Sequence, residues 1–195
     1  MKNVFIINGH YPYPNRKGEL NSSLVDLARK HFENRGAKVS ITETKDEYVV
    51  EEELQKFIDA DLVIWQFPVH WMGLPWRVKQ YFDIVFTAGH NGELFTSDGR
   101  TPANPKANYG SGGSRQDTKY MLSATFNAPM HAFNAPDEYL FEGKDVEDIM
   151  FPIHMTMKFL GMQGLPTFSC HDVVKNPTIE SDFDRFEEHL ANIKL

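Results

Sequence analysis

With 195 residues, the chain has a length typical of one domain with a full hydrophobic core. Its net charge of −7 argues against a nucleic-acid backbone or an anionic membrane as the main partner, because both attract positively charged surfaces. A single cysteine, Cys170, excludes a disulfide framework within the chain and a zinc site built from cysteines, which suits a reducing compartment. The apolar run at the start of the chain is too short for a signal peptide or a membrane span. We therefore expect a cytoplasmic protein with no integral membrane association.

Strands and helices are predicted to alternate along the chain. We expect strands at 4–9, 37–43, 61–67, 119–126 and 165–173. We expect helices at 21–35, 50–60, 75–86, 152–160 and 180–193, the first capped by Asn21 or Ser22 and the third begun by Pro75. Each strand is an almost continuous apolar run, which indicates a parallel sheet covered by helices on both faces. The prediction is an α/β fold of the flavodoxin-like, doubly wound kind, with five strands in the order 2-1-3-4-5.

The segment 87–118 is a long stretch with little periodicity and many Gly, Asn, Ser and Pro residues. Loops beyond about 12–15 residues are usually lids, binding loops or disordered segments. We interpret this segment as a loop insertion at about 87–118 within a single domain of residues 1–195, because no internal repeat and no second core is visible.

Ligands of open parallel sheets bind beyond the carboxyl ends of the strands, where the strand order reverses. Three loops should meet there, at 10–22, 67–75 and 126–136. The first carries Arg16, Gly18, Ser22 and Ser23 and leads into a helix, and the free N–H groups of a helix start suit a phosphate or pyrophosphate. A plain capped helix start is the alternative, since neither G-x-G-x-x-G nor a P-loop lysine motif is present.

The second loop contains the stretch QFPVHWMGLPW (66–76). Pro68 and Pro75 fix the backbone at both ends, Gly73 permits close approach of a ligand, and Trp71 and Met72 offer polarizable surface. We interpret this loop as one wall of a site for a planar ring. The alternative is that its aromatic side chains pack the core or a subunit interface.

The third loop offers Thr125, Phe126, Asn127 and Ala128 where the fourth strand ends. The upstream stretch YGSGGS (109–114) offers Tyr109 on a flexible backbone, and we expect it at the same sheet edge. No histidine pair has metal-ligand spacing, so we expect no metal site. No nucleophile elbow is present, and Cys170 has no visible environment that would activate it.

Several stretches resemble one known family. They are NGHYPYPNRKGELNSSL (8–24), QFPVHWMGLPWRVKQYFDIVF (66–86), SDGR (97–100), YGSGGS (109–114), KYMLSATFNAPMHAF (119–133) and FLGMQGLPTF (159–168). They resemble the modulator of drug activity B branch of the NAD(P)H dehydrogenase (quinone) family, which consists of flavodoxin-like flavoproteins. The likeness spans nearly the whole chain, and P-x-x-W-M-G-x-P-W followed by T-(W/F)-N-A-P is highly specific.

The resemblance implies a homodimer that binds FAD noncovalently, with FMN as the alternative, and that uses NADPH as the usual donor and quinones as acceptors. It implies that the flavin phosphates lie at Arg16, Gly18, Glu19, Leu20, Asn21, Ser22 and Ser23. It implies that the isoalloxazine is lined by Pro68, Val69, His70, Trp71, Met72 and Gly73, with Tyr109, Thr125, Phe126, Asn127 and Ala128 completing the site. Arg16 stands where the family often has serine, and Phe126 where tryptophan is common.

The activity implied by the resemblance is a ping-pong transfer of two electrons. A hydride passes from the nicotinamide to the flavin and then to a quinone, and Tyr109 is our candidate for orienting the quinone oxygen. One alternative is an FMN-dependent azo- or nitroreductase on the same fold. A different class of alternative is a non-catalytic binding or regulatory module with a flavodoxin-like fold.

Overall fold

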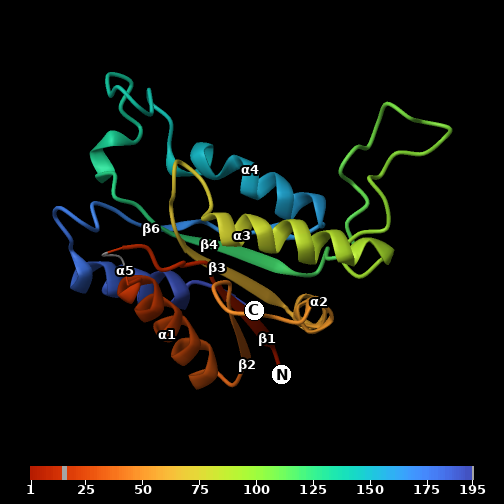
Figure 1. Ribbon diagram of the computed structural model, residues 1–195, viewed down its shortest axis with the longest axis horizontal. Coiled ribbons are helices and arrows are strands. Elements are labelled where there is room, and N and C mark those ends of the chain that lie inside the picture. The colour runs from red at the N-terminus through yellow and green to blue at the C-terminus, as the bar shows by residue number, and fades with distance from the viewer. Residues whose placement is uncertain (15–16, 195) are drawn as a thin grey trace.

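The computed structural model describes residues 1–14 and 17–194 and has a parallel sheet at its centre (Figure 1). Its strands are β1 (Asn3–Asn8), β2 (Lys38–Glu43), β3 (Leu62–Pro68), β4 (Lys119–Thr125), β5 (Gln163–Gly164) and β6 (Phe168–Cys170). The order is β2-β1-β3-β4-β5, with β6 also paired to β4, and each of these pairings is parallel. The predicted order 2-1-3-4-5 is therefore confirmed.

Two short strands occupy the fifth position of the sheet, where the sequence analysis predicted one strand at 165–173. β5 pairs with the start of β4 and β6 with its end. Pro166 lies between them and has no amide hydrogen for the ladder, so the pairing is interrupted there. The prediction of one continuous strand was wrong for this reason.

Helices cover both faces of the sheet and enclose two separate apolar clusters. α1 (Glu19–Asn34) and α5 (Ile179–Ala191) pack on one face, where Leu24, Phe32 and Phe186 are buried. α2 (Val50–Asp59), α3 (Trp76–Tyr81) and α4 (Val146–Phe159) pack on the other. The helix predicted at 75–86 is α3 followed by a π-helical turn, η1 (Phe82–Phe86). Two 3-10 turns, η2 (Gly89–Asn91) and η3 (Met130–Ala132), lie in the connections.

Two helices start earlier than predicted. α1 begins at Glu19 after Gly18, so neither Asn21 nor Ser22 is its cap. α4 begins at Val146, and Pro152 lies inside the helix instead of starting it. Its start is fixed by a capping box, in which Asp145 and Asp148 each accept a hydrogen bond from the other's backbone N–H.

A buried carboxylate ties α2 to α3. Glu53 is only 2% exposed and accepts a 2.6 Å hydrogen bond from the Tyr81 hydroxyl. It also accepts from Thr42 on β2, and Lys56 forms an ion pair with it at 2.6 Å. Burial raises the pKa of Tyr81 well above its ordinary value, so its phenol remains a donor. The network holds α3 in a fixed position on the sheet.

The segment 87–118 lies at the amino edge of the sheet and extends away from the helical layers (Figure 1). α3 runs from the carboxyl edge back to the amino edge, where the segment joins β4 at Lys119. Arg115 donates from its side chain to Ile58 O and from its backbone to Leu160 O, which anchors the return of the segment. Within residues 1–14 and 17–194, no helix is both long and apolar enough to cross a membrane.

Candidate functional site

The loops that follow β1 and β3 meet closely at the carboxyl edge of the sheet. Gly9 donates its backbone N–H to Gln66 O at 2.7 Å. A Cβ on Gly9 would lie 2.5 Å from Val78 Cγ2 and 2.9 Å from Phe67 Cβ. Only glycine fits between β3 and α3 at this point, and the chain can therefore leave β1 directly beside the loop 68–75.

Gly18 opens α1 in a left-handed conformation, with φ of +79°. A Cβ there would lie 2.3 Å from His10 Nδ1, so the buried imidazole fills the space beneath the glycine. In the part of the chain that the structure describes, no side chain caps the start of α1. The first N–H groups of α1 and its dipole therefore face the loop after β1, an arrangement that suits an anion. Arg16, also predicted for this loop, lies outside the described residues.

Asn21 is a buried link between three elements. Its Oδ1 accepts from Gln66 Nε2 at 2.8 Å, and its Nδ2 lies 3.4 Å from Thr125 Oγ1 as a donor. α1, β3 and β4 are thus joined by side chains just below the carboxyl edge. This role explains why Asn21 points into the protein and does not cap the helix.

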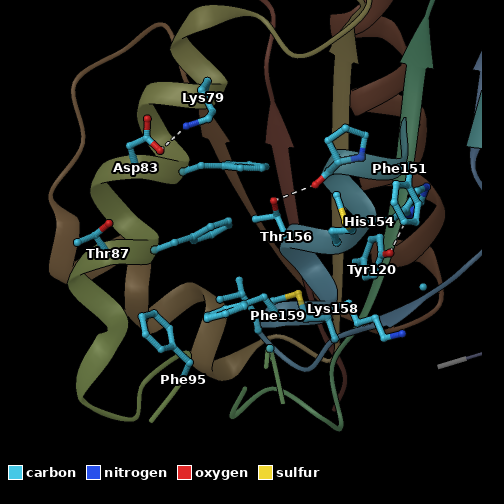
Figure 2. A pocket seen from close by; sticks show the side chains of 18 of the residues that line it. Lys79, Asp83, Thr87, Phe95, Tyr120, Phe151, His154, Thr156, Lys158 and Phe159 are labelled. Atoms are coloured by element: carbon cyan, nitrogen blue, oxygen red, sulfur yellow. Dashed lines mark hydrogen bonds and ion pairs between the residues drawn. The ribbon is translucent and has the colours of Figure 1, made fainter. Parts of the chain in front are cut away.

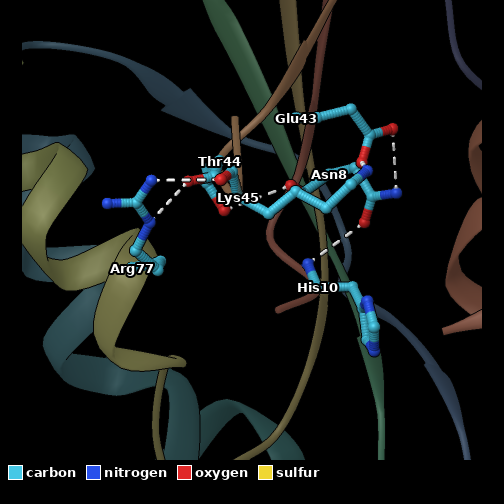
Figure 3. Close-up of polar contacts among 6 residues, drawn as sticks. All are labelled: Asn8, His10, Glu43, Thr44, Lys45 and Arg77. Carbon is cyan, nitrogen blue, oxygen red and sulfur yellow. Dashed lines mark hydrogen bonds and ion pairs between the residues drawn. The ribbon is translucent and has the colours of Figure 1, made fainter. Parts of the chain in front are cut away.

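Polar contacts join the end of β1 to the end of β2, and the loop after β2 to α3 (Figure 3). Asn8 Nδ2 donates to Glu43 at 3.1 Å, and Asn8 Oδ1 accepts the backbone N–H of His10 at 3.1 Å. Arg77 on α3 donates to the carbonyl oxygens of Thr44 and Lys45 at 3.0 and 3.1 Å. The base of the site is therefore held by hydrogen bonds from three elements.

The loop after β3 ends in a tight two-residue turn. His70 and Gly73 exchange two backbone hydrogen bonds, of 2.9 and 3.0 Å. Between them, Trp71 and Met72 have φ of +47° and +62°, a region that bulky residues rarely adopt. Trp71 is 95% exposed, and a Cβ on Gly73 would meet no atom within 4 Å. The turn thus presents apolar side chains to an open space, and strain of this kind is concentrated at functional sites.

The loop after β4 is bound to the segment that follows β6. Phe126 donates its N–H to Cys170 O at 2.8 Å, and Asp172 N–H donates to Ala128 O at 3.1 Å. The ring of Phe126 is buried and lies parallel to that of His171, with centroids 5.2 Å apart. Burial lowers the pKa of His171, so this imidazole is held neutral beside the loop. His171 was not among the predicted site residues, although it lies in the strand predicted at 165–173.

The carboxyl edge brings together nearly all of the predicted site residues. They are Gly18, Glu19, Leu20, Asn21, Ser22, Ser23, Pro68, Val69, His70, Trp71, Met72, Gly73, Thr125, Phe126, Asn127 and Ala128. Tyr109 is not among them. Its ring packs 6.1 Å from that of Phe159, at the end of α4, and it precedes β4, so it lies at the amino edge. The expectation that Tyr109 shares the edge of these loops is wrong for a single chain.

A groove of about 1030 Å³ lies between α3 with η1 and α4, away from the loops described above (Figure 2). Its walls are apolar and aromatic, and include Phe82, Phe86 and Phe159. Tyr120 and His154, whose Oη and Nδ1 are 2.7 Å apart, also line it. Tyr109 also lines this groove.

A carboxylate, an imidazole and a phenol are connected in series beside this groove. Glu147 approaches His154 Nε2 at 2.6 Å, and His154 in turn contacts Tyr120. The contact with His154 lowers the pKa of Glu147, and burial raises the pKa of Tyr120 to about 12. No group of three or more metal-ligating side chains occurs in the described residues.

The parallel sheet, its strand order and the loops at its carboxyl edge define a doubly wound flavodoxin-like protein. The chain belongs to the family with a flavodoxin-like fold, whose sequence pattern matches residues 2–193. It is 42% identical over 191 residues to NADPH:quinone oxidoreductase MdaB of Haemophilus influenzae, and the match covers 98% of each chain. The resemblance to the modulator of drug activity B branch is therefore confirmed.

Solved structures share the fold at lower identity. The NAD(P)H:quinone oxidoreductase of Methanothermobacter marburgensis superposes with a TM-score of 0.70 at 14% identity, covering 99% of each chain. General stress protein 14 of Treponema denticola, solved in complex with FMN, superposes with a TM-score of 0.62 at 20% identity, covering 98% of this chain and 95% of its own. At these identities the likeness extends to the fold alone.

Proposed function

We propose that the protein is a flavin-dependent NAD(P)H:quinone oxidoreductase with NADPH as the preferred donor. The observation that carries this proposal is the 42% identity, over 98% of both chains, with a protein named as an NADPH:quinone oxidoreductase. The geometry of the carboxyl edge supports it, because an anion-compatible helix start and an exposed apolar turn both lie at this edge of the sheet.

FAD is the proposed cofactor, with FMN as the alternative. The start of α1 at Gly18 to Ser23 would hold the phosphates through backbone N–H groups and hydroxyls. His70, Trp71 and Met72 would form the wall for the isoalloxazine, and Asn127 and Ala128 would approach its polar edge with their backbone. The residues fit a flavin because no side chain among residues 1–14 and 17–194 caps the helix start, and a Cβ on Gly73 would meet no atom within 4 Å.

Bound there, the flavin would supply hydride transfer, from NADPH in one half-reaction and to a quinone in the other, so that both substrates use one stacking position in turn. The protein's own contribution is mainly positional. The Glu53 network and Arg77 hold α3, which follows the turn 70–73 in the chain, while Asn21 holds α1 against β3 and β4. Backbone N–H groups near 125–128 would stabilise negative charge that develops on a bound ring.

A homodimer is part of the proposal. Phe151 and Met155 line the groove between α3 and α4 and are about half exposed, which leaves an apolar surface that a second copy would cover. Tyr109 lines the same groove. Because Tyr109 is far from the loops of its own chain, its predicted role in the site and in orienting a quinone requires a second copy. Analytical ultracentrifugation of Phe151→Glu tests this, and an unchanged dimer would place the interface elsewhere.

The experiment that tests the function starts with the absorbance spectrum of the purified protein and chromatography of the flavin it releases. NADPH oxidation is then measured with and without menadione. A yellow protein that releases FAD and consumes NADPH rapidly only with the quinone supports the proposal. Release of FMN with faster reduction of azo or nitro compounds would favour the azo- or nitroreductase. A colourless protein that takes up no flavin would contradict an enzyme of this class.

A further inference from the structure

The stretch Tyr-Pro-Tyr-Pro at 11–14 forms a stiff arm after β1. A residue before proline is pushed toward extended backbone, and proline fixes its own φ near −65°. Tyr11 and Tyr13 each precede a proline, so both backbone positions are restricted. The two aromatic side chains are therefore presented with little backbone freedom and at little cost in conformational entropy on folding.

This arm lies along the segment 70–76 and contacts it at both ends. The ring of Tyr13 stacks on the imidazole of His70, with centroids 4.4 Å apart and an interplanar angle of 23°. The ring of Tyr11 meets that of Trp76 edge to face at 5.3 Å, and the two tyrosines are 5.6 Å apart. We call these four side chains, Tyr11, Tyr13, His70 and Trp76, the aromatic clasp.

The aromatic clasp joins the two loops that flank the crevice where a ligand of this fold binds. β1 and β3 are neighbours in the sheet, and the strand order reverses at β1. Tyr13 belongs to the loop after β1 and His70 to the loop after β3. The stacked pair thus connects the two loops, and one face of His70 is already covered by a planar ring.

We propose that Tyr13 is a specificity-determining residue of this site, because its ring occupies one face of His70, a residue of the wall that we propose for a planar ligand ring. The inference rests on the proposed flavin function. A ligand enters only if its own ring replaces that of Tyr13, which favours large flat rings over small or non-planar ones. The displaced tyrosine then covers the outer side of the bound ring and excludes water. Selection of the ligand thus depends on competition between its ring and the Tyr13 ring for His70.

The magnitude of the effect follows from the stack. A stacked aromatic pair is worth a factor of about 2 to 10 in an equilibrium constant beyond its buried area. If binding requires the open form, the apparent association rate is reduced by the fraction of molecules in which the pair is open. Removing the Tyr13 ring should therefore speed entry of the ligand by roughly this factor.

The test uses stopped-flow quenching of flavin fluorescence, with FAD and FMN as probes and full-length apoprotein. Tyr13→Ala should raise the association rate constant about 2- to 10-fold, and the dissociation rate constant should also rise because the cover is lost. Tyr13→Phe is the matched control, since it keeps the ring, and it should behave as the wild type. An association rate that is the same in Tyr13→Ala and wild type, or equally raised in Tyr13→Phe, overturns the inference.

A second measurement needs no flavin. Partial burial holds the pKa of His70 below its ordinary value, and the Tyr13 ring supplies part of that cover. In Tyr13→Ala, NMR titration of the His70 ring protons should show the pKa moving up toward the ordinary value, while Tyr13→Phe leaves it unchanged. An unmoved pKa in Tyr13→Ala would show that the stack is absent in solution and would overturn the inference. Failure of the wild type to bind either flavin would instead overturn the proposed function, and this inference with it.

Discussion

Replacing Gly18 by alanine tests the start of α1 as the anion-binding end of the site. Two costs add at this position. With φ of +79°, an alanine would lie in the left-handed region, at a cost of about 1 to 2 kcal/mol. The added Cβ would also lie 2.3 Å from His10 Nδ1, and displacing a buried ring in this way costs roughly 1 to 3 kcal/mol. The sum is about 2 to 5 kcal/mol, or a fall in Tm of roughly 6 to 15 °C.

The chain offers a matched control for this variant. Gly36 has φ of +81°, and an added Cβ there meets no atom within 4 Å, so Gly36→Ala carries only the backbone cost. We expect it to lower Tm by roughly 3 to 6 °C and to leave flavin affinity unchanged. Circular dichroism melts and fluorescence titrations with FAD compare the two variants. Equal losses of stability, or full flavin affinity in Gly18→Ala, would refute the reasoning.

Three further predictions concern the network, the cofactor and pH. Tyr81→Phe removes a donor from the buried carboxylate of Glu53 and should lower the free energy of unfolding by about 2 kcal/mol in urea titrations. Ser22→Ala should weaken retention of FAD more than of FMN if this loop holds the distal phosphate; equal loss of both flavins would count against that placement. The lowered pKa of Glu147 means that its contribution to stability is present above the ordinary glutamate pKa of about 4.3 and is lost as the pH falls through the lower folded value. Glu147→Gln should therefore lose less stability than the wild type on acidification from about pH 5, which acid titrations followed by circular dichroism would measure.

Element type could be predicted because it rests on local patterns, and the strand order could be predicted because alternating strands and helices indicate a doubly wound sheet. Continuous apolar runs marked the strands, and helical periodicity marked the helices between them. The predicted start of this helix at Pro152 was wrong, because α4 begins at Val146 and accommodates the proline in its interior. The Asp-Val-Glu-Asp sequence at 145–148 carried the capping signal, and it was available in the sequence.

The site was predictable as far as topology determines it. The loops after β1, β3 and β4 necessarily share one edge in a parallel sheet, and their residues do so. The same argument would have placed Tyr109 at the opposite edge, because it lies between the end of a returning helix and the start of β4. The positive φ of Trp71 and Met72, and the stacking of His171 on Phe126, depend on tertiary contacts that no local pattern encodes.

At the turn formed by Trp71 and Met72, substitutions that raise stability should lower activity, which matters for directed evolution of the protein. Hairpin turns with two positive φ values are normally built from asparagine and glycine, and each of these bulky residues costs about 1 to 2 kcal/mol in that conformation. A library screened only for heat resistance should therefore accumulate Asn or Gly at positions 71 and 72. A library screened for turnover should retain the original pair. Thermostabilised variants changed at these two positions would lose the wall that we propose for the flavin.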